Sequence, residues 1–174
     1  MSRILTYLEI DGRTKTVTLL AARDGQPRDY VEIAEVIPEN SSATTDDLRQ
    51  LWRRIAFSVA VHNTDDHLRN HGFLRHKSGW RLAPGFDINP NPELAARRVT
   101  SIGGADNPAD EVDALLAYSE SFGLTDSQAR AVLREVAEAA GNWEAVARRN
   151  GIAEAEITRF DRVLKHTIDA VSLS

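Results

Sequence analysis

Cysteine is absent from this sequence of 174 residues, and so is any long apolar run. Without cysteine the chain has neither disulfides nor thiolate metal sites. No apolar run approaches the roughly 20 residues that a membrane-spanning helix needs. The first ten residues include the acidic Glu9 and no small-residue cleavage site, which argues against a signal peptide. Together these absences favour a cytoplasmic location.

Positive charge is also scarce, because 21 Lys and Arg residues face 26 Asp and Glu residues, for a formal net charge of −5. Strong binding to nucleic acid by a chain on its own needs a basic footprint, so we expect none here. Two short basic clusters, Arg97-Arg98 and Arg148-Arg149, are interpreted as solvated surface. With 42% hydrophobic and 27% charged residues, the composition is typical of one soluble globular domain spanning residues 1–174.

Strand signals occur in two places along the chain. Alternation and an enrichment in Thr, Val, Ile and Tyr predict a hairpin formed by residues 3–10 and 15–20. A second hairpin is expected from residues 71–75 and 80–83, joined by a turn at 76–79. We therefore expect a small β insertion within the fold.

Helical signals begin at Tyr30. Residues 30–37 predict a short helix stopped by Pro38. A longer helix follows, with Thr45 as its N-cap and apolar residues at helical spacing after it. Over residues 57–61 this helix loses its polar face, which indicates that it enters the core. A polar segment starts at His62-Asn63 and is expected to project as a loop from the end of the buried helix.

The C-terminal part is predicted to be helical after an irregular stretch. Prolines and glycines over residues 89–108 predict irregular structure. Four helices are then expected, one of them preceded by a capping box of Thr125 and Gln128. Glycines that fall at helix junctions, where a left-handed residue often ends a helix, are Gly123, Gly141 and Gly151. The fold class expected from these signals is mostly α.

The polar segment carries residues suited to phosphoryl transfer. That reaction needs a group that accepts or orients the proton of the attacking hydroxyl, and oxygen ligands for magnesium. One solution is an Asp followed five residues later by an Asn, with a second Asp on a later turn. Asp65 and Asn70 have this spacing, whereas Asp66 lies one residue too near. Because a hairpin returns the chain to its start, Asp87 is expected near Asn70.

Other interpretations of the same segment stay open on spacing alone. A polar surface loop with Asn, Asp and His is common in proteins. Four histidines in and after the segment suggest a zinc site, although the predicted hairpin does not gather them on one face: His62, His67, His71 and His76. The order Asp66-His67 reverses the His-Asp order of metal phosphohydrolases, which counts against that class.

Two runs of the sequence resemble the HipA family of toxin kinases. The first is Asn-Thr-Asp-Asp-His-Leu-Arg-Asn-His-Gly-Phe-Leu at residues 63–74, and the second is Trp-Arg-Leu-Ala-Pro-Gly-Phe-Asp-Ile-Asn-Pro at residues 80–90. The resemblance covers nearly the whole chain and matches the C-terminal region of the family. It implies a helical, kinase-like C-terminal lobe in which a small β-hairpin insertion carries the catalytic and metal-binding loop.

The resemblance also implies roles for four residues. Asp65 matches the catalytic base, and Asn70 and Asp87 match the magnesium ligands that hold the nucleotide phosphates. His67 matches a position inside the catalytic loop, where we expect it to orient the loop. ATP and Mg²⁺ are the implied cofactors, and a protein hydroxyl is the implied acceptor.

Partners follow from the resemblance as well. An aminoacyl-tRNA synthetase is an implied substrate, and a DNA-binding antitoxin of the HipB type is an implied partner. Full-length members carry a nucleotide-binding N-lobe before this region, and residues 1–62 contain one lysine, Lys15, and no Gly-rich loop. We therefore expect little activity without a separate N-lobe. The alternative is a non-catalytic module that binds the antitoxin.

Overall fold

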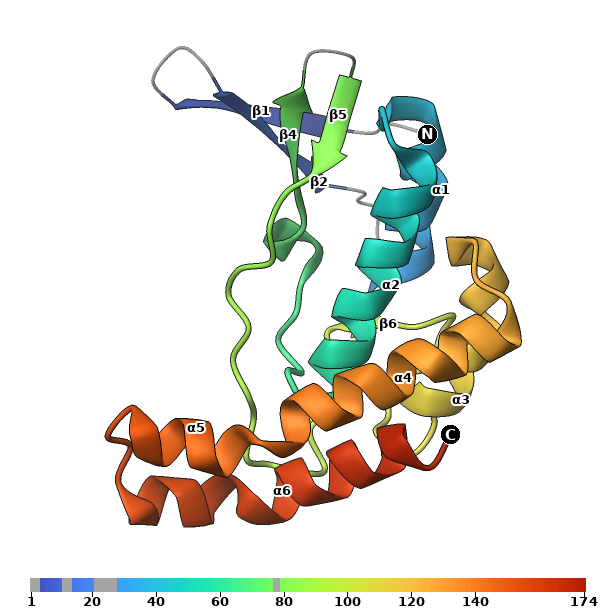
Figure 1. Ribbon diagram of the computed structural model, residues 1–174. Coiled ribbons are helices and arrows are strands. Elements are labelled where there is room, and N and C mark those ends of the chain that lie inside the picture. Colours follow the sequence, from blue (N-terminus) through green and yellow to red (C-terminus); the bar gives the residue numbers. More distant parts are fainter. Residues whose placement is uncertain (1–3, 11–13, 21–27, 77–78) are drawn as a thin grey trace.

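The computed structural model describes residues 4–10, 14–20, 28–76 and 79–174. A small sheet lies at one end of the molecule, a layer of helices lies at the other, and two helices and two irregular segments connect them (Figure 1). The prediction of a mostly α fold is confirmed. No helix in these ranges is both long enough and apolar enough to cross a membrane.

The two predicted hairpins are confirmed, and they join into one sheet. β1 (Ile4–Ile10) pairs antiparallel with β2 (Thr14–Leu20), and β4 (Gly72–His76) pairs antiparallel with β5 (Gly79–Leu82). β2 also pairs with β4, so that the strand order is β1-β2-β4-β5. The second hairpin is therefore no separate insertion, because the first hairpin extends it. Residues 77–78 of its predicted turn lie outside the described residues.

α1 (Tyr30–Asn40) begins where Asp29 accepts a hydrogen bond from Val31 N at 2.9 Å. The expected stop at Pro38 is wrong, since the helix continues to Asn40. Pro38 lies in the last turn, where its missing N–H removes only one helical hydrogen bond. The turn is closed by a 2.8 Å hydrogen bond from Ser41 N to Ile37 O.

α2 (Thr44–Ala60) is the central helix of the fold. Its N-cap is Ala43 and not the expected Thr45, and the Ala43 N–H is satisfied by Ser41 Oγ at 2.9 Å. Trp52 in its middle has no exposed surface and donates from Nε1 to the Leu115 carbonyl at 3.1 Å. The expected entry of its last turns into the core is confirmed by their burial, and this fixes where the following loop begins.

The remaining helices form the base of the molecule. They are α3 (Glu111–Ala117), the 3-10 turn η2 (Ser119–Phe122), α4 (Asp126–Gly141), α5 (Trp143–Arg149) and α6 (Glu154–Ser172). Both hydrogen bonds of the predicted capping box between Thr125 and Gln128 are present. Gly123 and Gly151 have positive φ as expected, whereas Gly141 is still helical. α4 packs on α2 and α6 (Figure 1).

Most of residues 89–108 is irregular, as expected. The exception is β6 (Thr100–Ser101), which pairs in parallel with β3 (Arg28–Asp29). Asp29 also accepts hydrogen bonds from Ser101 Oγ at 2.6 Å and from Gly104 N at 2.8 Å. These contacts hold the irregular segment against the start of α1, beside the polar loop.

Candidate functional site

The polar loop starts with an abrupt end of α2. His62 has a φ of 52°, and it is one of two non-glycine residues with positive φ in the described ranges. A left-handed residue reverses the chain after a helix, and a non-glycine residue needs support to stay there. His62 has that support, because its Nε2 lies 3.0 Å from the Glu93 carbonyl and its own carbonyl accepts from Asn91 N at 3.0 Å.

The irregular segment covers the loop. Asn91 Nδ2 donates to Thr64 Oγ1 at 2.8 Å, and Val99 N donates to the Thr64 carbonyl at 2.9 Å. Most of the loop is consequently buried, and only Asp65 and Arg69 are exposed. The expectation of a projecting loop is therefore wrong. Thr64 receives hydrogen bonds from a side chain and a backbone amide of the covering segment, and these contacts hold the loop in place.

Asp66 is built into the protein interior. It is 6% exposed, and its two carboxylate oxygens accept from Tyr30 Oη at 2.7 Å and pair with His71 Nε2 at 3.0 Å. Burial alone would raise the pKa of Asp66, but the hydrogen bonds from His71 and Tyr30 hold it below its ordinary value. Burial raises the pKa of Tyr30 well above its ordinary value, so Tyr30 stays a neutral donor.

Arg98 ties the loop to the helices. Its guanidinium forms a bidentate pair with Glu111 at 2.9 and 3.2 Å, and both side chains are at most 1% exposed. Nη1 of Arg98 also donates to the Asn63 carbonyl at 2.8 Å and to Ser58 Oγ at 2.9 Å. One buried cation thus joins α2, the loop and α3.

The interpretation of Arg97-Arg98 as solvated surface is wrong for Arg98. Burial works to lower the pKa of Arg98, but Tyr30 and Glu111 together raise it above its ordinary value. Arg97 is the exposed member and pairs with Asp106 at 3.2 Å. Nothing in the local sequence distinguishes the two arginines, because only the fold places Glu111 opposite one of them.

Asp65 contrasts with its neighbour Asp66. Its side chain is exposed and makes no hydrogen bond or ion pair with the part of the chain that the structure describes. Its carbonyl accepts from His67 N at 3.0 Å, and the His67 carbonyl accepts from Asn70 N at 2.8 Å. The backbone of His67 thus helps to hold the turn between Asp65 and Asn70, while its buried Nδ1 has no described partner.

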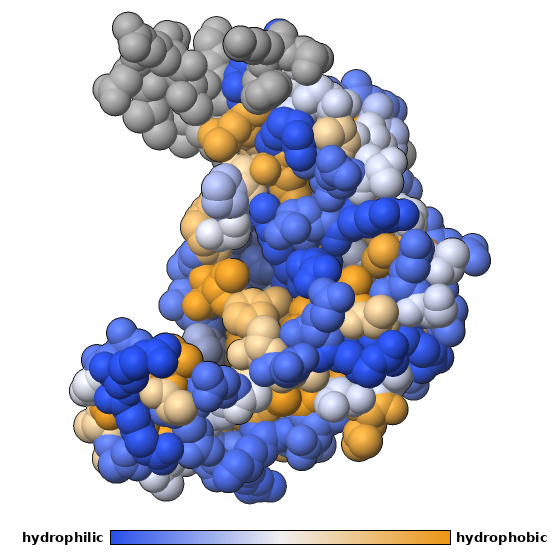
Figure 2. Space-filling model, in the orientation of Figure 1, coloured by the Kyte–Doolittle hydropathy of each residue, from blue (hydrophilic) through white to orange (hydrophobic). Residues whose placement is uncertain are grey.

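Asn70 ends the 3-10 turn η1 (Leu68–Asn70) and faces the segment after β5. It lines a small pocket, here called the loop pocket, together with Gly85, Phe86 and Ile88. Phe86 and Ile88 are exposed apolar residues, and apolar surface gathers on the concave side of the molecule where this segment runs (Figure 2). The structure therefore brings Asn70 to the residues that flank Asp87.

Asp87 is held in an unusual backbone conformation. Its φ is 57°, which for a non-glycine residue stores strain and is frequent at functional sites. Its exposed carboxylate accepts a hydrogen bond from Asn89 Nδ2 at 2.8 Å. The hairpin returns Gly85, Phe86 and Ile88 to the pocket that Asn70 lines, and the closeness of Asp87 itself to Asn70 stays a prediction.

Two side chains of the site, Asp87 and Asn70, carry oxygen atoms that could bind a metal ion. No group of three or more His, Asp or Glu side chains in the described ranges is placed to hold a metal ion. Among the four histidines that suggested zinc, His62 and His71 use their Nε2 atoms on the Glu93 carbonyl and on Asp66. A carboxylate and an amide are hard ligands that suit magnesium, so the pair of Asp87 and Asn70 fits that ion.

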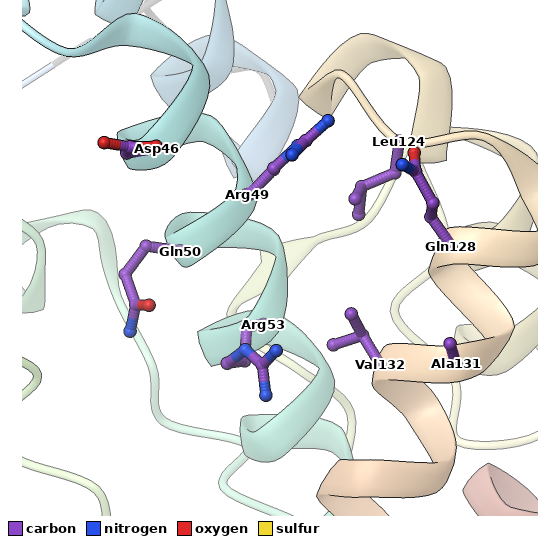
Figure 3. Close-up of a pocket in the computed structure, with 8 residues that line it drawn as sticks. All are labelled: Asp46, Arg49, Gln50, Arg53, Leu124, Gln128, Ala131 and Val132. Carbon is purple, nitrogen blue, oxygen red and sulfur yellow. The ribbon is translucent and has the colours of Figure 1, made fainter.

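A second hollow, of about 450 Å³, lies between α2 and α4. Arg49 and Arg53 extend from α2 toward α4, and Leu124 and Val132 face them (Figure 3). Arg53 pairs with Glu135 of α4 at 2.7 Å. The hollow therefore has an apolar wall and arginines that already have protein partners.

This arrangement is a helical lobe with a largely buried polar loop next to a small sheet. The family model for the HipA-like C-terminal domain matches residues 9–143, and the chain belongs to that family. It is similar in fold to a chain of the HipA, HipB and operator DNA complex of the Shewanella oneidensis MR-1 toxin–antitoxin system. That match has a TM-score of 0.55 and 16% identity over 87% of this chain, and this chain spans 35% of that one. No curated protein matches by sequence.

Proposed function

We propose that this chain is the catalytic lobe of a HipA-type serine/threonine kinase, which transfers a phosphoryl group from ATP to a protein hydroxyl. The observation that carries the proposal is the difference between two adjacent carboxylates. Asp66 is locked by Tyr30 and His71, while Asp65 is exposed and has no partner in the described ranges. A free carboxylate on a rigid loop is suited to accept or orient the proton of the hydroxyl that attacks the phosphoryl group.

Four residues of the loop and the following segment would have separate roles in phosphoryl transfer. Asp65 would accept or orient the proton of the attacking hydroxyl. Asn70 and Asp87 would hold Mg²⁺, which supplies charge neutralisation for the phosphate oxygens when it is bound. His67 would keep the turn between Asp65 and Asn70 in shape through its backbone hydrogen bonds.

The nucleotide needs contacts beyond those that Asn70 and Asp87 would make through Mg²⁺. Lys165 is paired with Asp161 at 2.7 Å on α6, so it is not free to clamp phosphates. The related HipA chain is much longer than this one. Our proposal therefore includes a nucleotide-holding lobe supplied by further sequence or by a second chain, and little activity without it.

Substrate and partner are part of the same proposal. The acceptor would be a serine or threonine hydroxyl, with an aminoacyl-tRNA synthetase as one candidate. A HipB-type antitoxin is the partner that the complex with Shewanella oneidensis HipA suggests. With a formal net charge of −5, this chain would leave most DNA contacts to that partner.

The test is phosphate incorporation into protein when the chain is mixed with a separately expressed HipA N-lobe, ATP and Mg²⁺. We expect incorporation by the unaltered chain and none by Asp65→Asn, with both folded to the same extent by circular dichroism. Incorporation no higher than in the Asp65→Asn control would overturn the proposal.

A second candidate function is a non-catalytic module that binds an antitoxin. The ion pair of Lys165 with Asp161, which keeps this lysine from clamping phosphates, favours it. It requires that the isolated chain turns over no ATP. ATP hydrolysis that disappears in Asp87→Ala would refute this candidate. We also expect the isolated chain to bind Mg·ADP more weakly than micromolar, measurable by calorimetry.

A further inference from the structure

Three arginines on α2 differ in what holds them. Arg53 pairs with Glu135 at 2.7 Å, and Arg49 Nε donates to the Gly123 carbonyl at 3.4 Å. Both arginines line the hollow of Figure 3. Arg54, the next residue after Arg53, is partly buried. It makes no hydrogen bond or ion pair within the chain as described. Of the three, Arg54 is therefore the one whose guanidinium has no hydrogen bond or ion pair with the described residues.

Arg54 lies at the loop pocket. It lines the pocket with Asn70 and Phe86, and a Cβ placed on Gly85 would lie 3.9 Å from its Cδ. Gly85 comes two residues before Asp87 in the chain. Burial lowers the pKa of Arg54, and the charge of Asp47 opposes this only in part. An arginine that is partly withdrawn from water without a partner is unfavourable for folding, which suggests a role outside folding.

The carboxylate oxygens of Asp66 and the hydroxyl of Ser58 in the loop pocket are in use, while two donors that line the pocket, on Arg54 and Asn70, have no described hydrogen-bond partner. Both oxygens of Asp66 have partners, and Ser58 Oγ accepts a hydrogen bond from Arg98 Nη1 at 2.9 Å. Asn70 Nδ2 is buried, with the residue 7% exposed, and has no described partner. A pocket with a free guanidinium and a free amide donor favours a ligand with anionic oxygens.

We propose that Arg54 and Asn70 Nδ2 together bind the oxygens of a phosphoryl group beside Asp87. The inference rests on the proposed kinase function and adds to it a phosphate-binding residue from α2. Arg54 would supply part of the positive charge that stabilises the phosphate, from within this lobe. Its planar fork suits phosphate oxygens, and the same oxygens are offered by a nucleotide and by a phosphorylated product.

The test is a titration of the whole chain followed by NMR, with Mg·pyrophosphate standing for the nucleotide and O-phosphoserine for the product. Arg54→Met is compared with Arg53→Met, which removes the same charge from the adjacent residue. We expect Arg54→Met to bind at least one probe about tenfold more weakly, as expected for a lost charged hydrogen bond, and Arg53→Met to bind like the unaltered chain. The probe that responds identifies the source of the phosphoryl group.

Stability gives a second measurement on the same variants. A residue that only supports the fold would destabilise the protein when replaced, whereas Arg54→Met should be at least as stable as the unaltered chain. Equal affinities of Arg54→Met and Arg53→Met for both probes would overturn the inference. The inference would also be overturned if the unaltered chain bound neither probe at millimolar concentrations.

Failure of this inference can be told from failure of the kinase function. Asp65→Asn should abolish phosphate incorporation and leave binding of pyrophosphate intact. If Arg54→Met binds normally while Asp65→Asn still abolishes incorporation, the phosphate site is refuted and the function stands. If Arg54→Met binds weakly while Asp65→Asn incorporates phosphate like the unaltered chain, the reverse holds.

Discussion

Two arginines lie beside the same loop in opposite situations. Arg98 is fully buried and is held by Glu111, Ser58 and the Asn63 carbonyl. Arg54 is partly buried and has no hydrogen bond or ion pair in the described ranges. Burial acts to lower the pKa of both, but partners reverse the direction only for Arg98.

The comparison separates residues that build the site from residues that can serve a ligand. Asp66 belongs with Arg98, because Tyr30 and His71 use both of its oxygens. Asp65 belongs with Arg54, since each presents a charge that the described residues leave free. Changes to Arg98 or Asp66 should therefore affect stability most, and changes to Arg54 or Asp65 should affect activity or binding.

The largest expected effect is on the buried pair. Arg98→Met leaves Glu111 as an unpaired charge in the interior, and this should lower the free energy of unfolding by about 3–5 kcal/mol. Urea denaturation measures it. The double change Arg98→Met with Glu111→Leu should recover much of the loss, because no charge is left buried. A loss below about 1 kcal/mol in the single variant would show that the pair is not structural.

Tyr30→Phe should have the next largest effect. It removes the 2.7 Å hydrogen bond to Asp66 and leaves a buried carboxylate with one partner fewer. We expect a loss of about 1–3 kcal/mol in the free energy of unfolding. Tyr118→Phe, a matched change at a residue that is 38% exposed, should alter stability by less than about 0.5 kcal/mol. Equal losses in the two variants would contradict the assignment.

At acidic pH the protein should lose the smaller contribution to stability that ionised Asp66 makes. The pKa of Asp66 is held below its ordinary value of 3.8 in the folded protein. Its contribution to stability is therefore present above pH 3.8 and is lost as the pH falls through the lower, folded pKa. Tyr30→Phe should raise the pKa of Asp66 in the folded protein and so narrow the pH range over which its contribution to stability is lost. Unfolding curves at a series of acidic pH values measure this range. An unchanged range would count against the Tyr30 hydrogen bond.

The smallest effect on stability is expected at Asp65. Asp65→Asn should change the free energy of unfolding by less than about 0.5 kcal/mol, because the side chain is exposed and without a described partner. Asp66→Asn, one residue along, should clearly lower the free energy of unfolding, and urea denaturation of both variants measures the difference. If the two variants were equally stable, the division between the two carboxylates would be wrong.

Structural features that depend on neighbouring residues could be predicted from the sequence. Periodicity placed the helices, because burial of an apolar face leaves a repeat in the sequence, as at Leu51, Ile55 and Val59. Local chemistry gave the Thr125 and Gln128 capping box, whose two hydrogen bonds involve neighbouring residues only. The spacing of Asp65 and Asn70 indicated the candidate site for the same reason. In each case the signal lies within a few residues.

Long-range partners left no such signal. The sequence around Arg98 indicates a surface cluster, and nothing near Glu111 or Tyr30 indicates a structural role, because their partners come from distant parts of the chain. The covering of the loop by residues 91–99 was missed for the same reason, since prolines and polar residues predict an irregular segment without indicating what it contacts. Arg54 differs from Arg53 only through its position relative to the loop pocket.

The sequence by itself determined the helices, the two hairpins and the loop that carries Asp65 and Asn70, because these depend on local periodicity, turns and spacing. Only the tertiary structure decided which of two adjacent aspartates is buried, which of two adjacent arginines is paired, and that Asn70 meets the segment around Asp87. These outcomes depend on desolvation and on partners brought together from distant elements, and a charged side chain carries no mark of either in its own neighbourhood.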